Sequence, residues 1–203
     1  MTIKAIIWDF GGVLLRTMNS EPRTKLASEF GMTRYALEFL VFASPPGLQA
    51  QKGKIKPDKL WDVVLAEIGA PPDQKEAVQS RFWGGDALDT ELVSFIRSLK
   101  SQYKTALLSN AWLDLRQMLS DEWGIADIFD EIIISAEVGL MKPDPGIYQI
   151  ALAQLDLNPE ETVFIDDFSG NVDSARKVGI HAIQFVSPAQ TKEELSKLLA
   201  DNA

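Results

Sequence analysis

Six polar side chains in this sequence stand at or just after the ends of apolar segments. They are Asp9 after AIIW, Ser109 and Asn110 after TALL, Lys142 in the loop GLMKPDPG, and Asp166 with Asp167 after TVFI. Any one of them could be an ordinary turn residue or a helix cap, because these residue types are common at both positions. If the fold brings them together, however, the group could act on a phosphate ester.

The carboxylates in this group suit attack on phosphorus and the binding of a metal ion. Asp9 is the candidate nucleophile, because a carboxylate can attack phosphorus and form an aspartyl-phosphate. Three converging carboxylates repel one another and the phosphate unless a hard divalent cation lies between them. Since Mg²⁺ prefers carboxylate, carbonyl and water oxygens, we expect Asp9 and Asp167 to bind it, with Asp166 directly or through water.

The other three side chains suit the phosphoryl group itself. The ammonium group of Lys142 can offset the charge that develops on the phosphoryl oxygens. The hydroxyl of Ser109 and the amide of Asn110 can donate hydrogen bonds to the same oxygens. We therefore expect Lys142 to take part in catalysis and all three side chains to bind the substrate.

Five apolar segments predict the strands that would position these residues: KAIIWDF, KTALLSN, EIIIS, TVFIDD and HAIQFV. Their nearly continuous apolar character is typical of strands covered on both faces, and the segments between them have helical spacing. This alternation favours an α/β fold with a doubly wound, Rossmann-like parallel sheet of about five strands. Because ligands bind beyond the carboxyl ends of such strands, we expect the six side chains at one edge.

The interval between Asp9 and Ser109 is too long for one strand–helix–strand unit. The two residues are 100 positions apart, whereas such a unit needs only about 30 residues. We expect a small inserted helical cap at 16–87, with helices over 20–30, 33–43, 57–68 and 72–83, and a core of 1–15 and 88–203. SPPG, KGKIK and GAPP are interpreted as breaks between these helices. Two tethers, 14–19 and 84–90, suggest that the cap opens and closes.

Composition limits the partners of the protein. The net charge is −9 without a basic cluster, which argues against nucleic acid as a partner. The chain has no cysteine, which excludes disulfides and thiolate metal sites. The apolar run at 3–10 is too short for a membrane span and lacks signal-peptide features. We expect a cytoplasmic protein that is a monomer or a homodimer and does not bind membranes.

Four segments resemble, in order, the motifs of the haloacid dehalogenase-like hydrolase superfamily. They are WDFGGVL, LLSN, GLMKPDPGIYQIAL and VFIDDFSGNVDSARKVGIHAIQFV. The likeness spans residues 3–186 and is greatest to the helical-cap branch that includes sugar-phosphate phosphatases and the N-terminal phosphatase domain of soluble epoxide hydrolases. The resemblance implies a magnesium-dependent phosphatase that acts on a small phosphorylated metabolite.

The resemblance also implies roles for individual residues. Asp9 would be the nucleophile, Ser109 would contact the phosphate, Lys142 would steady both, Asp167 would bind Mg²⁺, and Asn171 would orient the groups around the metal. The residue two positions after the nucleophile would offer its backbone carbonyl to the metal. In this chain that residue is Gly11, so Gly11 is a further expected metal ligand.

Gly11 is also the main departure from the family pattern. Family phosphatases usually carry an aspartate there, which protonates the leaving group and then activates water. General acid–base assistance is worth about 10²- to 10⁴-fold, so a phosphatase without it could be slow, restricted to good leaving groups, or supplied with an acid by the cap or substrate. Two alternatives follow: a non-catalytic or very slow member that binds a phosphorylated ligand or a protein, and a metal-independent 2-haloacid dehalogenase in which Asp9 attacks carbon.

Other conspicuous residues have simpler interpretations. His181 lies at the amino end of the last expected strand, which places it away from the site. We expect Trp61 and Trp83 to pack in the cap, whereas Trp112 could line a pocket or pack in a core. Five cap or tether side chains are candidates for substrate selection: Arg16, Asn19, Arg34, Tyr35 and Gln49.

Overall fold

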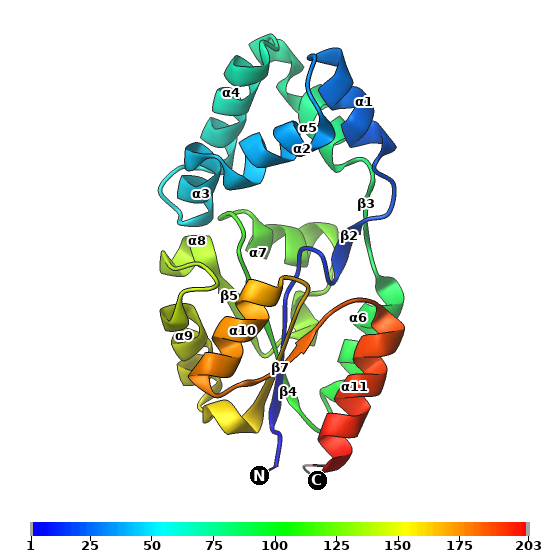
Figure 1. The fold of residues 1–203 in the computed structure, drawn as a ribbon, viewed down its shortest axis with the longest axis vertical. Helices are drawn as coiled ribbons and strands as arrows, with labels where there is room; N and C mark the ends of the chain where they lie inside the picture. Colours follow the sequence, from blue (N-terminus) through cyan, green and yellow to red (C-terminus); the bar gives the residue numbers. More distant parts are fainter. Residues whose placement is uncertain (1, 202–203) are drawn as a thin grey trace.

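Within residues 2–201, which the computed structural model describes, five parallel strands form a central sheet in the order β5-β4-β1-β6-β7 (Figure 1). The strands are β1 (Ala5–Trp8), β4 (Lys104–Ser109), β5 (Glu131–Ile134), β6 (Thr162–Asp166) and β7 (His181–Gln184). Each falls within one of the five apolar segments that predicted it, and the expected α/β class is confirmed.

The register of the central strands brings the polar strand ends together. Trp8 of β1 pairs with Leu107 of β4 and with Ile165 of β6. Asp9 is therefore level with the carboxyl ends of both neighbouring strands, within one residue of Ser109, and its amide donates a hydrogen bond to the carbonyl of Ile165 at 2.9 Å.

Helices cover both faces of the sheet because successive strand residues point to opposite sides. Ile6 and Trp8 pack in the core that includes α6 (Thr90–Leu99) and α11 (Pro188–Asp201). Ala5 and Ile7 pack with α9 (Pro145–Leu155) and α10 (Ser169–Val178). Shorter pieces lie between these elements: α7 (Leu115–Gln117), a π-helix (Met118–Glu122), α8 (Ser135–Val138) and 3₁₀ turns at Ala126–Ile128 and Pro159–Glu161.

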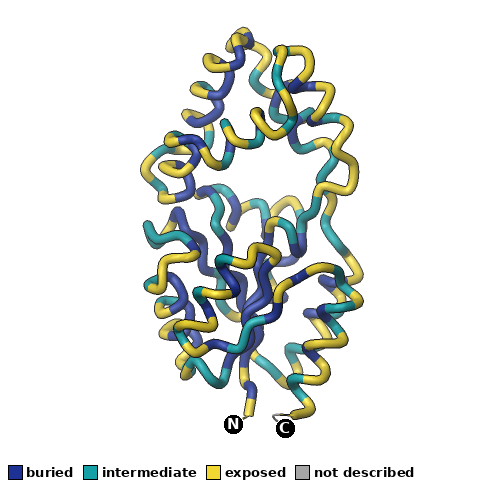
Figure 2. The backbone as a smooth tube through the Cα atoms, in the orientation of Figure 1, coloured by how far each residue is buried: buried dark blue, intermediate teal, exposed yellow. Residues whose placement is uncertain are grey.

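A separate group of helices stands over the carboxyl edge of the sheet (Figure 1), and we call residues 21–83 the cap. Its helices are α1 (Glu21–Glu29), α2 (Arg34–Glu38) continued by a π-helix (Phe39–Ala43), α3 (Pro45–Gln51), α4 (Pro57–Ile68) and α5 (Lys75–Trp83), which follows a 3₁₀ turn (Pro72–Gln74). Buried residues accordingly gather in two places, around the central strands and on the inward sides of these helices (Figure 2).

The segment SPPG lies at a break between helices, as expected, because the preceding helix ends at Ala43. It also begins helix α3, which was not expected from the sequence. The hydroxyl of Ser44 accepts a hydrogen bond from the amide of Gly47 at 3.2 Å, and Pro45 and Pro46 occupy the first turn. Proline suits the first turn of a helix, because its missing N–H has no partner to lose there.

The cap is joined to the core by its tethers and by direct contacts. The two tethers pair as a short antiparallel ribbon of β2 (Leu15–Thr17) and β3 (Asp86–Leu88). On the other side, Gly53 lies so close to α8 that a Cβ atom there would be 2.1 Å from the carbonyl oxygen of Ala136. Gly53 also has a φ of +69°, so both contact and conformation favour glycine.

Among residues 2–201, none of the helices combines the length and the apolar character needed to cross a bilayer.

Candidate active site

A buried lysine joins two buried carboxylates at the centre of the sheet's carboxyl edge. Lys142 Nζ lies 2.7 Å from Asp9 Oδ1 and 2.6 Å from Asp166 Oδ2. The exposed fraction is 7% for Asp9, 3% for Lys142 and zero for Asp166. Such buried charges are stable only when they are paired and hydrogen-bonded, so this geometry is held by the surrounding protein.

The two oxygens of Asp9 have different surroundings. Oδ1 accepts the backbone N–H of Phe10 at 2.7 Å and also faces Lys142. Within the described part of the chain, Oδ2 accepts no hydrogen bond, and Asp9 borders the cavity beneath the cap. One oxygen is therefore fixed by the protein, and the other is available for chemistry.

Asp166 is occupied by protein contacts on both oxygens. It accepts the N–H of Phe168 at 2.8 Å on Oδ1, the ammonium of Lys142 on Oδ2, and the amide of Asn171 at 3.0 Å on both. Asn171 lies in the first turn of α10, where its carbonyl accepts the hydroxyl of Tyr148 at 2.8 Å. Asp166 thus orients Lys142 and Asn171, which the strand-end pattern alone could not reveal.

Three carboxylates at this edge are close enough to share a metal ion. One oxygen from each of Asp9, Asp166 and Asp167 lies within 4.8 Å of the others. Asp167 is the exposed member, and it rests against Gly12, where a Cβ atom would lie 2.4 Å from its Oδ2. Three carboxylates with one lysine leave two negative charges, and hard oxygen donors of this kind fit Mg²⁺.

Burial changes the protonation of this group in the absence of metal. Burial, with a smaller contribution from the nearby Asp166, raises the pKa of Asp9 to about 8 against the opposing effect of Lys142. The pKa of Asp167 is also raised, first by partial burial and then by Asp166. A bound cation would favour the charged forms of both groups, so metal binding and proton release are coupled.

Ser109 and Asn110 lie at the end of β4, as expected, but they differ in what they contact. Ser109 is buried and borders the cavity. Asn110 also borders the cavity, but its amide donates to the carbonyl of Lys142 and accepts the N–H of the same residue, both at 2.8 Å. Asn110 therefore holds the Lys142 backbone, and its expected contact with substrate stays a prediction.

Gly11 leaves an open position at the floor of the cavity. Among the described residues, none has an atom within 4 Å of a Cβ built on Gly11, and its φ lies outside the positive range. Position 11 therefore has room for a Cβ atom, although glycine provides no side chain there. The predicted metal contact of the Gly11 carbonyl stays a prediction.

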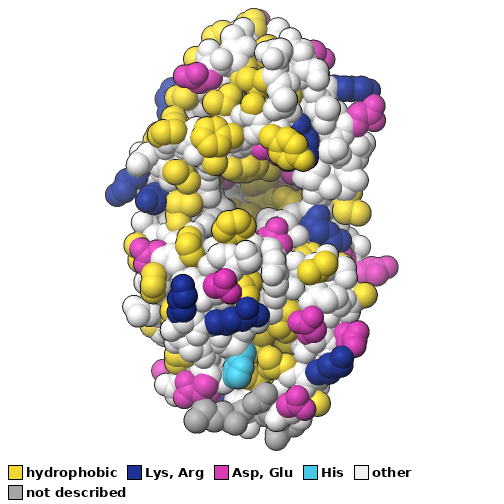
Figure 3. Space-filling model, in the orientation of Figure 1, with side chains coloured by type: hydrophobic (Ala, Val, Ile, Leu, Met, Phe, Trp, Pro, Cys, Tyr) yellow, Lys and Arg dark blue, Asp and Glu magenta, His cyan; other side chains and the backbone are white. Residues whose placement is uncertain are grey.

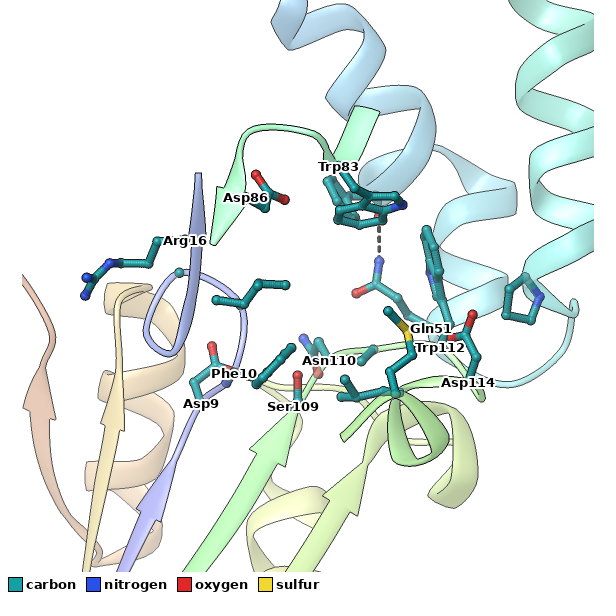
Figure 4. A pocket seen from close by; sticks show the side chains of 18 of the residues that line it. Asp9, Phe10, Arg16, Gln51, Trp83, Asp86, Ser109, Asn110, Trp112 and Asp114 are labelled. Carbon is teal, nitrogen blue, oxygen red and sulfur yellow. Dashed lines mark hydrogen bonds between the residues drawn. The ribbon is translucent and has the colours of Figure 1, made fainter. Parts of the chain in front are cut away.

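A cavity of about 1150 Å³ lies between the sheet edge and the cap. Figure 3 shows the hollow with hydrophobic side chains around it, and Figure 4 shows Asp9 and Ser109 below Trp83 and Trp112. Of the five side chains considered for substrate selection, Arg16 alone borders this cavity within the described residues. Arg34 instead pairs with Glu38, and Tyr35 is 72% exposed.

The tryptophans combine packing with cavity lining. Trp61 is buried in the cap core, as expected, and also borders the cavity. Trp83 is only half-buried and borders it too, whereas Trp112 joins the cap core from the loop after β4. His181 begins β7, at the opposite end of that strand from the site, as expected.

Sequence reasoning missed several other cavity residues. Phe42, Leu115, Met118 and Trp123 all border the cavity. The last three come from WLDLRQMLSDEWG, which starts at Trp112, two residues after Asn110, and therefore close to the functional edge of the sheet. That position was a usable signal, but the helical spacing of the segment favoured a packing role.

Comparisons with known proteins add to this geometry. A family model described as haloacid dehalogenase-like hydrolase matches residues 3–179. The chain belongs to this family. The resemblance drawn from the four motifs is therefore confirmed, and the protein is a hydrolase of the haloacid dehalogenase-like family.

Individual relatives agree with this assignment. A sesquiterpene phosphatase of Aspergillus oryzae is 32% identical over 98% of this chain and 97% of its own length. The bifunctional epoxide hydrolase 2 of Mus musculus is 28% identical over 98% of this chain, which spans 39% of that longer protein. A solved haloacid dehalogenase-family enzyme of Bacteroides thetaiotaomicron, in complex with magnesium and inorganic phosphate, has a TM-score of 0.77. It is 23% identical, the match covers 92% of this chain and 96% of that one, and the likeness shows the fold.

Proposed function

We propose that this haloacid dehalogenase-like hydrolase is a magnesium-dependent phosphatase that acts on a small phosphorylated metabolite through an aspartyl-phosphate at Asp9. The observation that carries the proposal is the state of Asp9, whose Oδ1 is held by Lys142 and Phe10 while Oδ2 is left beside the cavity. A phosphatase among the relatives and a magnesium–phosphate complex among the structural neighbours support the same reaction class.

Each residue of the site has its own role in the proposed reaction. Asp9 Oδ2 attacks phosphorus, the bond to the ester oxygen breaks, and the released oxygen takes a proton from water. A second water then attacks the aspartyl-phosphate, which releases phosphate and restores the Asp9 carboxylate. Lys142 neutralises charge on Asp9 and on the phosphoryl oxygens, and Ser109 donates a hydrogen bond to the latter. Asp166 and Asn171 keep Lys142 in position, because their hydrogen bonds allow it little freedom.

The chemistry of the donor set suits Mg²⁺ as the resident ion. Asp9, Asp167 and the Gly11 carbonyl would hold it, with Asp166 acting directly or through water. When bound, the ion supplies positive charge that offsets repulsion between the phosphate and the three carboxylates. Gly12 permits Asp167 to occupy its place, because any larger residue would collide with that carboxylate.

Gly11 limits the rate of hydrolysis that these residues can support by themselves. It has no side chain to protonate the departing oxygen, so we expect fast turnover only with leaving groups that need no proton. The same feature favours a second candidate function, the binding of a phosphorylated ligand without turnover. The two functions differ in whether phosphate is released.

Phosphate release from acetyl phosphate tests the proposal, because acetate leaves without a proton. We expect release that requires Mg²⁺ and falls more than about a thousandfold in Asp9→Asn. Asp73→Asn, on an exposed turn of the cap, is the matched control. If the wild type releases no phosphate, or if Asp9→Asn is as active, the phosphatase proposal is wrong. Halide release from 2-haloacids without metal would identify the dehalogenase alternative.

A further inference from the structure

The cavity beside Asp9 is far larger than a phosphoryl group requires. Its volume is about 1150 Å³, whereas pockets for whole small ligands span about 300–1,000 Å³. The phosphate and its metal would occupy only the floor, next to Asp9 and Gly12. The remaining space is available to the organic part of the substrate, so its walls indicate what that part is.

Four aromatic side chains form one wall of this space, and we call Phe42, Trp61, Trp83 and Trp112 the aromatic wall. All four border the cavity. The Trp112 ring centroid lies 6.1 Å from that of Phe42 in a stacked arrangement, 5.9 Å from that of Trp83 and 6.3 Å from that of Trp61. Contacts among the rings fix their orientation before any ligand arrives.

The core side of the cavity also carries a group of apolar side chains. Phe10 and Trp123 lie there with ring centroids 5.0 Å apart, and Leu15, Leu88 and Met118 border the same space. Three members of the aromatic wall come from the cap, Trp112 comes from the loop after β4, and the second group of residues comes from the core side. An organic group between them would be covered on two sides.

The cations at this cavity are already neutralised by protein carboxylates. Arg16 pairs with Asp89, and its guanidinium points away from Trp83 and Trp112 (Figure 4). Arg23 is buried between Glu38 and Asp86, at 2.9 and 2.8 Å. Neither guanidinium is free to hold a second phosphate or a carboxylate on the substrate.

Two further polar side chains that border the cavity are occupied in the same way. Gln51 donates its amide to the carbonyl of Phe42 at 2.6 Å, and Thr17 donates its hydroxyl to Asp86, also at 2.6 Å. A polyol substrate would have to compete with these two contacts, whereas an apolar substrate would leave them undisturbed. Asp114 and Glu122 also border the cavity, so polar groups remain on its core side.

We propose that the substrate is the phosphate monoester of a large apolar alcohol, with its phosphate at Asp9 and its apolar group against the aromatic wall. This inference rests on the proposed function, because it takes the Asp9 edge as the phosphate site. Binding is driven by removal of apolar surface from water, so affinity grows with the length of the apolar group.

Alkylphosphonates test this without depending on turnover, because their carbon–phosphorus bond is not hydrolysed. We expect calorimetric Kd values, measured with Mg²⁺ and below the micelle concentration, to fall up to about fourfold for each methylene from propyl to decyl. A hydroxylated phosphonate of matched length should bind about 100-fold more weakly than decylphosphonate. A Kd that is independent of chain length, or tighter binding of the hydroxylated compound, would overturn the inference.

Variants on opposite sides of the cavity locate the effect. We expect Trp83→Ala in the cap and Met118→Ser in the core each to weaken decylphosphonate binding about tenfold and to reduce the gain for each methylene. Tyr35→Ala, which removes an exposed cap aromatic, should leave the whole series unchanged. Equal effects of all three variants would contradict the assignment of the aromatic wall.

Acetyl phosphate hydrolysis keeps the two proposals distinguishable. If acetyl phosphate is hydrolysed but phosphonate affinity does not depend on chain length, the inference about substrate class is wrong and the phosphatase proposal stands. If affinity follows chain length but acetyl phosphate is not hydrolysed, the apolar site is supported and catalysis is not.

Discussion

Restoring a carboxylate at position 11 should convert a weak phosphatase into a faster one. The resemblance to the family assigns proton transfer to the residue two positions after the nucleophile, and this chain has Gly11 there. A Cβ on Gly11 would meet no atom of the described residues within 4 Å, and its φ is not positive. Gly11→Asp therefore adds a Cβ without a clash and brings a carboxyl group to a residue that borders the cavity.

The size of the effect depends on the leaving group. General acid–base assistance contributes about 10²- to 10⁴-fold, so we expect kcat for an alkyl phosphate to rise by at least about 100-fold in Gly11→Asp. Acetyl phosphate should gain less than about tenfold, because acetate departs without a proton. Steady-state phosphate release with both substrates, at saturating Mg²⁺, measures the two ratios.

The neighbouring glycine is the matched control. Gly12 has a φ of +84°, and a Cβ there would lie 2.4 Å from Asp167 Oδ2. Gly12→Ala should therefore displace Asp167 and weaken Mg²⁺ binding. If Gly11→Asp leaves alkyl phosphate turnover unchanged, or raises both substrates equally, Gly11 is not the reason for slow turnover.

Three further perturbations test the packing and protonation of the site. Burial raises the pKa of Asp9 from 3.8 to about 8. Between these pH values the folded protein without metal holds a proton on Asp9 that the unfolded chain has lost. The free energy of unfolding should therefore fall as the pH rises from 3.8 to 8, by at most about 1.4 kcal/mol per pH unit. Asp9→Asn has no titrating group at this position, so its stability relative to the wild type should increase from pH 5 to 8. A difference in the free energy of urea unfolding, measured with EDTA, that stays constant over this pH range would refute this. Gly53→Ala, by forcing the cap away from Ala136, should raise KM for the substrate and increase proteolysis of the cap, whereas unchanged values of both would rule out this contact as a support of the closed cap. Tyr148→Phe removes the hydroxyl that donates to the buried carbonyl of Asn171 and should cost about 0.5–1.5 kcal/mol in thermal unfolding, and an unchanged Tm would contradict that.

The strand ends could be predicted from the sequence because their physical cause is local. The apolar runs before Asp9, Ser109 and Asp166 can be buried only as strands, and parallel strands bring their carboxyl ends to one edge. The involvement of Lys142, by contrast, was predicted from its residue type and from the family motif. The division into a core of 1–15 and 88–203 and a cap of 16–87 stays a prediction, as do the cytoplasmic location and the oligomeric state.

Features that depend on side-chain geometry could not be predicted in this way. The amide of Asn110 could bind phosphate or a neighbouring backbone, and only the structure places it on Lys142. The contribution of Phe42 and Trp83 to the cavity depends on how the cap is placed over the core. Helical spacing predicts that these residues pack, but it does not say which edge of each ring remains uncovered.

The most direct test of the central claim is a crystal structure with Mg²⁺ and beryllofluoride, which mimics a phosphoryl group on a carboxylate. The proposal predicts beryllium bonded to Oδ2 of Asp9, the oxygen that neither Phe10 nor Lys142 holds. Fluorines should lie near Lys142 and Ser109, and Mg²⁺ should lie between Asp9 and Asp167. Beryllofluoride on another carboxylate, or an unmodified Asp9 in crystals that contain Mg²⁺, would contradict the account.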